Sequence, residues 1–209
     1  MLIALSEIDH LVYATPDVDE TVEALGKLLG VKAAPGGRHP GRGTRNALIG
    51  LGPRCYLEIV GPDLEQPAPA QPRWFLIDSL HEARLVAWAA RDPDLEERSA
   101  EASAASLYLG PIASGSRRRP DGQLLSWRFT DPMIRVAGGV VPFFIDWGTG
   151  PHPADLLPQK ARLVKLRVQH SAAAALAFVR NLGTSATVQG GEGPSLVATL
   201  DAPRGLVDL

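Results

Sequence analysis

The sequence predicts an α+β fold built from repeated units, each with one strand, one helix and a strand hairpin. Three observations support this prediction: the order of the apolar segments, the Pro-rich stretches that separate them, and a composition typical of a globular protein. Of the 209 residues, 45% are hydrophobic and 21% are charged. This balance excludes an intrinsically disordered chain and allows a sizeable core.

The first unit opens with a strand over residues 3–14, whose second half is rich in β-branched and aromatic side chains. An amphipathic helix follows and ends at Gly30, because apolar side chains recur at helical spacing. These side chains are Val18, Val22, Leu25, Leu28 and Leu29. We expect a loop rich in Gly, Pro and Arg over 35–44, and then a hairpin of strands 46–51 and 55–60.

A linker with four prolines, residues 62–73, separates this unit from a second one over 84–150. The second unit repeats the order of the first. It begins with a strand, continues with a helix capped by Asp92, and ends with strands 124–130 and 140–147.

Residues 159–209 predict a third, partial βαββ unit with a strand, a helix ending at Gly183 and a final hairpin. Segment 203–209 resembles segment 53–59, which favours an internal repeat, although short apolar strands also resemble one another by chance. One such unit cannot bury its sheet alone, so we expect the units to pack face to face.

Four stretches together resemble the glyoxalase-like branch of the vicinal oxygen chelate superfamily. IDHLVYATPDVDETVEALGKLLGV and GRHPGRGTRNALIGLGPRCYLEIVGPD resemble its first module, and RRRPDGQLLSWRFTDP and GGVVPFFIDWGTGPHPA resemble its second. The resemblance covers about residues 5–157. It implies paired βαβββ modules that form a curved mixed sheet around a pocket.

The resemblance also implies a domain division. The glyoxalase-like domain spans 1–158, with module one at about 4–61 and module two at about 84–150, and residues 159–209 form the additional half-module. Because members of this branch exchange modules between chains, a homodimer is a further expectation.

Metal-dependent members place one ligand on the first strand and one on the last strand of each module, where this chain has His10 and Glu58. In a regular strand Ile8, His10 and Val12 share one face, as do Tyr56 and Glu58. The resemblance therefore implies His10 and Glu58 as catalytic residues and metal ligands. As alternatives they act as an acid–base pair without metal, or hydrogen-bond each other in a structural role.

Asp146 is a third candidate metal ligand, but a gap-free match of the modules places Ile145 rather than Asp146 opposite Glu58. The first strand of the second module offers no ligand. The implied cofactor is one divalent metal ion, such as zinc, nickel, iron or manganese, or none at all.

Ligand contacts are expected from the 38–46 loop, whose glycines allow close approach and whose arginines can clamp an acidic group. Tryptophans of the second module can line an apolar pocket. The expected ligand-binding residues are Arg38, His39, Arg45, Asn46, Trp127 and Trp147. A solvated loop and ordinary core packing are the alternatives, and the Arg117-Arg118-Arg119 turn either binds an anion or is a solvated hairpin end.

These features predict an enzyme that binds a small oxygenated organic molecule, as a lyase, isomerase or dioxygenase. The main alternative is a non-catalytic binding protein similar to the antibiotic-resistance members of the superfamily. The net charge of −2 gives no reason to expect nucleic acid or a membrane as partner. The single Cys55 suits a reducing compartment, so we expect the cytoplasm.

Overall fold

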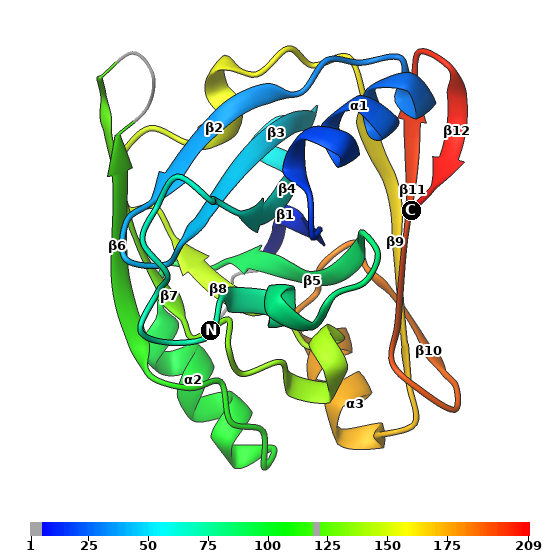
Figure 1. Cartoon of the computed structure of the whole chain (residues 1–209). Helices are drawn as coiled ribbons and strands as arrows, with labels where there is room; N and C mark the ends of the chain where they lie inside the picture. The colour runs from blue at the N-terminus through cyan, green and yellow to red at the C-terminus, as the bar shows by residue number, and fades with distance from the viewer. Residues whose placement is uncertain (1–5, 119–121) are drawn as a thin grey trace.

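The computed structural model describes residues 6–118 and 122–209, and within these ranges the strands form two sheets. In this part of the chain the larger sheet has eight strands in the order β2-β3-β4-β1-β5-β8-β7-β6 and curves around a central space (Figure 1). The smaller sheet has the order β10-β9-β11-β12 and stands beside it (Figure 1). The α+β class and the curved mixed sheet are confirmed.

The first module consists of β1 (Glu7–Ala14), α1 (Val18–Leu29), β2 (Ala34–His39), β3 (Thr44–Gly52) and β4 (Cys55–Pro62). Helix α1 confirms its prediction. The Asp17 side chain accepts from the backbone N–H of Glu20 at 3.0 Å, and Gly30 ends the helix with a left-handed φ of 72°. The prediction of a loop over 35–44 is wrong in its first half, because β2 pairs with β3 despite its Gly and Pro residues.

The second module consists of β5 (Arg84–Arg91), α2 (Leu95–Ala104), β6 (Ile112–Arg118), β7 (Leu124–Thr130) and β8 (Phe143–Asp146), with the short helices η1 (Trp74–Ser79) and η2 (Val136–Gly139) beside it. Strand β6 was not expected, because its small and polar residues carry little strand signal. The helix cap is Asp94 and not Asp92, whose carboxylate accepts from Arg98 instead. Arg119 of the predicted turn lies outside the described residues.

The two modules join through β1 and β5, which pair antiparallel at the centre of the larger sheet. Strand β4 lies parallel to β1, and β8 lies parallel to β5, so in both modules the first strand pairs in parallel with the last. Within the described ranges, no helix combines the length and the apolar character that crossing a membrane would require.

The C-terminal unit follows the short helix η3 (Pro153–Leu156) and consists of β9 (Arg162–His170), α3 (Ala173–Asn181), β10 (Thr187–Gly190), β11 (Ser195–Ala202) and β12 (Gly205–Asp208). Segments 203–209 and 53–59 each contain the second strand of an antiparallel pair, β11–β12 and β3–β4 respectively. The strand pairing of the C-terminal unit differs from that of the modules. Here the first strand pairs with the two strands after it, and not with the last one as β1 does with β4.

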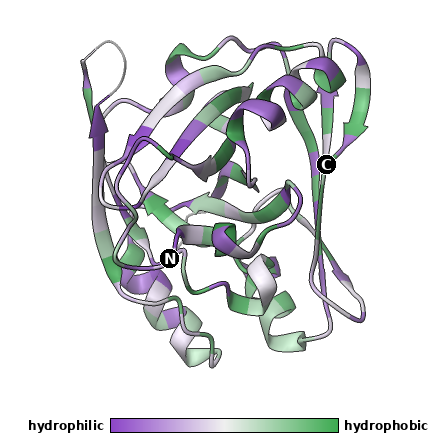
Figure 2. Cartoon of the chain, viewed as in Figure 1, coloured by the Kyte–Doolittle hydropathy of each residue, from purple (hydrophilic) through white to green (hydrophobic). Residues whose placement is uncertain are grey.

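The main core lies between the outer face of the larger sheet, the helices and the smaller sheet. Leu11, Leu57 and Trp88 enter it from the larger sheet, and Leu166 and Leu200 enter it from the smaller one. Figure 2 shows hydrophilic and hydrophobic segments on the same helix α1, as expected for a helix with one buried face. Burial of this shared core therefore ties the C-terminal unit to the two modules.

Trp88 provides a test of this core. Its side chain is fully buried, and its Nε1 donates to the backbone carbonyl of the buried Val140 at 2.9 Å. We expect Trp88→Phe to lower the free energy of unfolding by about 1–3 kcal/mol, because the carbonyl is left without its donor. Urea denaturation measures this, with Leu206→Ala, an exposed side chain, expected to stay within about 0.5 kcal/mol of wild type. An unchanged urea midpoint for Trp88→Phe would mean that this hydrogen bond adds nothing to the free energy of unfolding.

Candidate functional site

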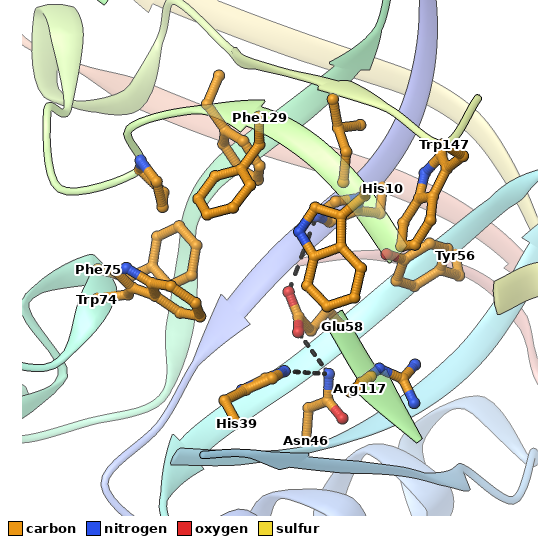
Figure 3. Close-up of a pocket in the computed structure, with 14 residues that line it drawn as sticks. His10, His39, Asn46, Tyr56, Glu58, Trp74, Phe75, Arg117, Phe129 and Trp147 are labelled. Carbon is orange, nitrogen blue, oxygen red and sulfur yellow. Dashed lines mark hydrogen bonds and ion pairs between the residues drawn. The ribbon is translucent and has the colours of Figure 1, made fainter. Parts of the chain in front are cut away.

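A pocket opens inside the curve of the larger sheet. Its volume is about 50 Å³, counted as the space open to the centre of a water molecule, so it holds a few waters or one end of a small molecule. Its polar lining residues are His10, His39, Asn46, Tyr56, Glu58 and Arg117. Its apolar lining residues include Trp74, Phe75, Trp127, Phe129, Phe143, Ile145 and Trp147 (Figure 3). One wall is therefore polar and the other aromatic.

Asp9 and His10 meet because a β-bulge interrupts β1. Ile8 lies opposite Ala90 and His10 lies opposite Ala89, so Asp9 is an extra residue without a partner in the ladder. Side chains of neighbouring residues in a regular strand point to opposite faces, but here His10 Nδ1 lies 2.7 Å from Asp9 Oδ1.

The same bulge corrects the expected strand faces. Ile8 packs into the outer core with Leu11, whereas Val12 belongs to a cluster on the other face of the sheet. The prediction that Ile8 shares a face with His10 and Val12 is therefore wrong.

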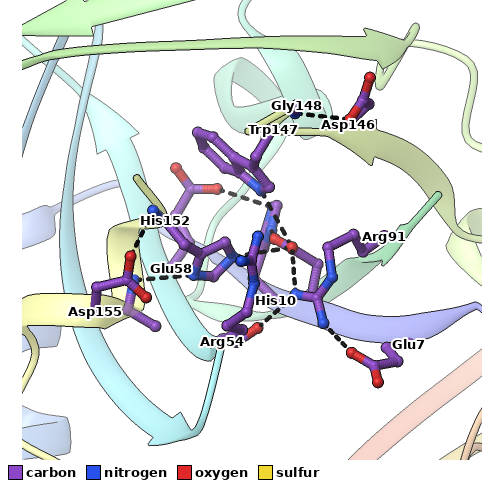
Figure 4. Close-up of polar contacts among 12 residues, drawn as sticks. Glu7, His10, Arg54, Glu58, Arg91, Asp146, Trp147, Gly148, His152 and Asp155 are labelled. Atoms are coloured by element: carbon purple, nitrogen blue, oxygen red, sulfur yellow. Dashed lines mark hydrogen bonds and ion pairs between the residues drawn. The ribbon is translucent and has the colours of Figure 1, made fainter. Parts of the chain in front are cut away.

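The Asp9 carboxylate is fully buried and is surrounded by donors. Its Oδ2 lies 3.0 Å from His152 Nε2, 3.1 Å from Trp147 Nε1 and 3.4 Å from Arg91 Nη1. Figure 4 shows His152, Trp147 and Arg91 close to one another. Burial by itself raises the pKa of Asp9, but the hydrogen bonds from His10 and His152 outweigh it and hold the pKa well below its usual range. Asp9 is therefore an ionised acceptor.

This network fixes the tautomers of both histidines. His152 Nδ1 accepts from the backbone N–H of Ala154 at 3.1 Å, so its Nε2 carries the proton that is donated to Asp9. His10 likewise donates from Nδ1 to the carboxylate, which leaves its Nε2 facing the pocket. The His10 ring stacks on Tyr56 with ring centroids 4.7 Å apart.

His10 Nε2 and Glu58 Oε2 are 3.8 Å apart, which is too far for a hydrogen bond. The other oxygen of Glu58 accepts from Asn46 Nδ2 at 2.5 Å, and that nitrogen also lies 3.4 Å from His39 Nε2 (Figure 3). His39 Nδ1 lies 2.9 Å from Thr44 Oγ1. Burial lowers the pKa of His39, against a smaller opposing effect of the Glu58 charge, and keeps its ring neutral. Asn46 and His39 thus position the carboxylate of Glu58.

Arg117 brings a permanent positive charge to this wall of the pocket. It lies near the end of β6, is buried, and donates from Nη1 to the carbonyl of Gly36 on β2. Its positive charge contributes to lowering the pKa of His39 and opposes the rise in the pKa of Tyr56 that burial causes. The sequence left this arginine either as an anion-binding group or as part of a solvated turn, and the structure places it in the pocket.

Three of the expected site residues lie elsewhere. Arg38 pairs with Asp63 and Glu65, and Arg45 makes two hydrogen bonds to Asp19, so each arginine is held by a nearby carboxylate outside the pocket. Asp146 accepts from the backbone N–H of Gly148 at 2.7 Å and lies away from His10 and Glu58 (Figure 4). The other expected residues line the pocket: His10, His39, Asn46, Glu58, Trp127 and Trp147.

Sequence reasoning missed Asp9, Tyr56 and the role of His152. Tyr56 could have been found, because it lies two residues before Glu58 on the same strand face. Asp9 has no such signal, since regular alternation would place it on the face opposite His10. His152 follows the last strand of the second module, where a histidine can cover the pocket mouth or be simply exposed, and its side chain is instead fully buried.

The divalent metal implied by the resemblance can be tested against these ligand atoms. Among the described residues, no group of three or more His, Cys, Asp or Glu side chains could hold a metal ion. Strand β8 of the second module lines the pocket with Phe143 and Ile145, and neither of these side chains can be a metal ligand. Catalytic zinc sites use three protein ligands, so the residues present do not fit a resident divalent metal.

The model of the family described as "Glyoxalase-like domain" matches residues 8–181 of this chain. The chain belongs to this family. The match confirms the resemblance to the vicinal oxygen chelate superfamily. It also extends past residue 158, through β9 and α3, so the glyoxalase-like match includes part of the C-terminal unit.

Solved structures similar to this glyoxalase-like protein include a hypothetical protein from Staphylococcus aureus, with 13% identity, a TM-score of 0.62, and coverage of 91% of this chain and 88% of that one. Methylmalonyl-CoA epimerase from Mycobacterium tuberculosis is 20% identical, with a TM-score of 0.45 and coverage of 72% and 94%. A Streptomyces coelicolor methylmalonyl-CoA epimerase variant in complex with 2-nitronate-propionyl-CoA is also 20% identical, with a TM-score of 0.47 and coverage of 70% and 100%. No curated protein matches the chain. At 13% identity, the likeness to the Staphylococcus aureus protein shows the fold alone.

His39 of this glyoxalase-like domain predicts a pH dependence of stability. Because burial lowers its pKa in the folded state, the unfolded chain binds a proton that the folded one does not, and stability falls as the pH drops below about 6.5. We expect this effect to reach at most about 2 kcal/mol at pH 5 and to be absent in His39→Gln. Urea denaturation between pH 7 and 5 measures it, with the exposed His81→Gln as control. An equal fall in His39→Gln would contradict the assignment.

Proposed function

We propose that this glyoxalase-like protein is an enzyme that moves a proton to or from a carbon next to a carbonyl group in a small oxygenated molecule. The observation that supports this proposal is the arrangement of Asp9, His10 and Glu58. An ionised, buried carboxylate holds the Nδ1 proton of His10 and turns Nε2 toward the pocket, 3.8 Å from a second carboxylate. This is the arrangement that a general base requires.

In the proposed step, His10 Nε2 takes the proton from the substrate carbon. The C–H bond breaks, its electron pair forms an enolate, and the resulting imidazolium is stabilised by Asp9. Glu58, positioned by Asn46, is the second acid–base group, and in its protonated form it delivers a proton to the same carbon or its neighbour. When the enolate electron pair forms this new C–H bond the chemistry is that of an isomerase; when the pair instead expels a group from the neighbouring carbon, which leaves with the Glu58 proton, it is that of a lyase.

Arg117 supplies the positive charge that an enolate oxygen or a substrate carboxylate requires in the pocket. Aromatic side chains of the second module and of η1, such as Trp74, Trp127 and Phe129, form the opposite wall and favour a flat or apolar substrate group. The dioxygenase alternative would need a redox metal, which this set of ligand atoms does not fit.

A non-catalytic binding protein is the second candidate function. The aromatic wall and the apolar Phe143 and Ile145 on β8 favour it, because a sequestering protein needs a pocket of suitable shape and no acid–base pair. The two functions differ in one measurable property. A binding protein holds its ligand without exchanging any carbon-bound hydrogen of that ligand.

Hydrogen exchange tests the proposed chemistry directly. We expect the protein to replace the hydrogen next to the carbonyl in at least one member of a panel of small 2-oxo acids and hydroxyketones in deuterated water, followed by proton NMR. His10→Ala and Glu58→Gln should abolish exchange, and Asp9→Asn should slow it about 10²- to 10⁴-fold, because the His10 tautomer and its positive charge lose their partner.

The matched control is His81→Ala, which removes an exposed histidine outside the pocket and should keep the full exchange rate. Exchange that persists in His10→Ala would refute the role of this residue. Ligand binding without exchange anywhere in the panel would favour the binding protein.

Metal content gives an independent prediction. We expect protein purified without chelator or affinity tag to hold far less than one equivalent of zinc, nickel, iron or manganese, and its exchange activity to survive EDTA, because His10 and Glu58 have no third ligand among residues 6–118 and 122–209. Elemental analysis measures this. Close to one equivalent per chain in wild type, lost in both His10→Ala and Glu58→Ala, would instead establish a metal-dependent enzyme.

A further inference from the structure

A second groove lies where strand β5, the short helix η2 and the start of β11 meet. Its volume is about 500 Å³, counted in the same way as that of the pocket, and it is lined by Tyr13, Arg84, Leu85, Arg135, Ser195 and Leu196, among others. Because β11 belongs to the smaller sheet and β5 to the larger one, the groove lies at the junction of the two sheets. None of these side chains takes part in the proton transfer proposed above.

Two arginines face this groove, which Leu209, the last residue of the sequence, also lines. Arg84 is exposed and Arg135 is partly buried, and in the described ranges neither forms an ion pair with an acidic side chain. Burial lowers the pKa of Arg135, and the nearby charge of Arg84 lowers it further. Two neighbouring positive charges that repel each other create a local potential that favours a bound anion.

Arg135 is held in place by backbone groups. Its Nη2 donates to the carbonyls of Val86 at 3.1 Å and of Gly138 at 2.8 Å, while its Nε is buried and has no hydrogen-bond partner among the described residues. A buried donor without an acceptor costs free energy of folding, and more so on a charged group, so the guanidinium of Arg135 is incompletely compensated by the described residues. Other arginines of the chain, such as Arg38 and Arg45, are paired with carboxylates.

The remaining walls indicate the shape of the ligand. The hydroxyl-bearing residues Tyr13 and Ser195 line the groove together with the apolar Leu85, Leu196 and Pro194. The negative charge of Glu82 contributes to raising the pKa of Tyr13. Because that charge would repel an anionic group near Tyr13, the anionic group is better placed at the arginine end. At that end Gly138 has a φ of 68°, and a Cβ there would lie 2.6 Å from Pro194, so the backbone is closely packed.

We propose that this groove is a second binding site, which takes a small organic anion. The phosphate or carboxylate group of the ligand lies between Arg84 and Arg135, where the exposed Arg84 guanidinium can donate two parallel hydrogen bonds and Arg135, whose Nη2 is held by backbone carbonyls, can donate from Nη1. Its apolar part lies against Leu85 and Leu196. The proposal is independent of the function of the pocket, because the two sites share no lining residue.

Phenyl phosphate is the probe, because it joins a phosphate to an apolar ring, and phenol is its neutral counterpart. In a titration of the full-length chain followed by ¹⁵N-resolved NMR, we expect saturable shifts at the amides of Val86, Gly138 and Ser195, and no saturable shifts there with phenol. Arg84→Gln and Arg135→Gln should each weaken binding by about tenfold or more, because each removes a charge-assisted contact.

Arg204→Gln is the matched control, since it removes an exposed arginine that lines a different groove, and it should leave binding unchanged. Arg84 is itself exposed, so its variant tests the site even if Arg135→Gln fails to fold. Shifts confined to the pocket around Arg117, equal binding by Arg84→Gln, or equal shifts with phenol would each overturn the proposal. Proton exchange in the pocket is measured separately, so failure of one proposal leaves the other intact.

Discussion

The ionised carboxylate of Asp9 is the interaction on which the rest of the site depends. A charge buried in a protein interior is costly unless donors surround it, and here the donors come from distant parts of the chain. His10 belongs to the same strand, Arg91 ends β5 of the second module, and Trp147 and His152 follow β8. Satisfying this single carboxylate therefore joins both modules and orients the histidine that faces the pocket.

The two modules have different tasks although their strands pair in the same way. The first module supplies the polar wall of the pocket, with Glu58 held by Asn46, and the second supplies mainly aromatic and aliphatic side chains such as Phe143. Because β1 and β5 pair within one chain, a single copy brings lining residues of both modules to the pocket. The site is thus asymmetric, with most of its titratable groups from one module and most of its aromatic and aliphatic side chains from the other.

The C-terminal unit has another role. Its strands pair differently from those of the modules and form a separate sheet, and none of its described residues lines the pocket. Instead it covers the outer face of the larger sheet, where Leu166 and Leu200 belong to the same buried core as Leu11 and Trp88. Covering this face also creates the groove with two arginines, so the same packing that stabilises the fold forms a second concave surface.

Caps, helical periodicity and strand alternation are local signals, so they sufficed to predict the module order, helix α1 and the strands on which His10 and Glu58 face one pocket. The sequence did not reveal strands β2 and β6, whose composition is atypical. Only the tertiary structure decided that Asp9 joins His10, since one extra residue in a β-bulge reverses the expected face. The fold also buries His152 and pairs Arg38 and Arg45 with carboxylates outside the pocket, because those outcomes depend on partners far away in the sequence.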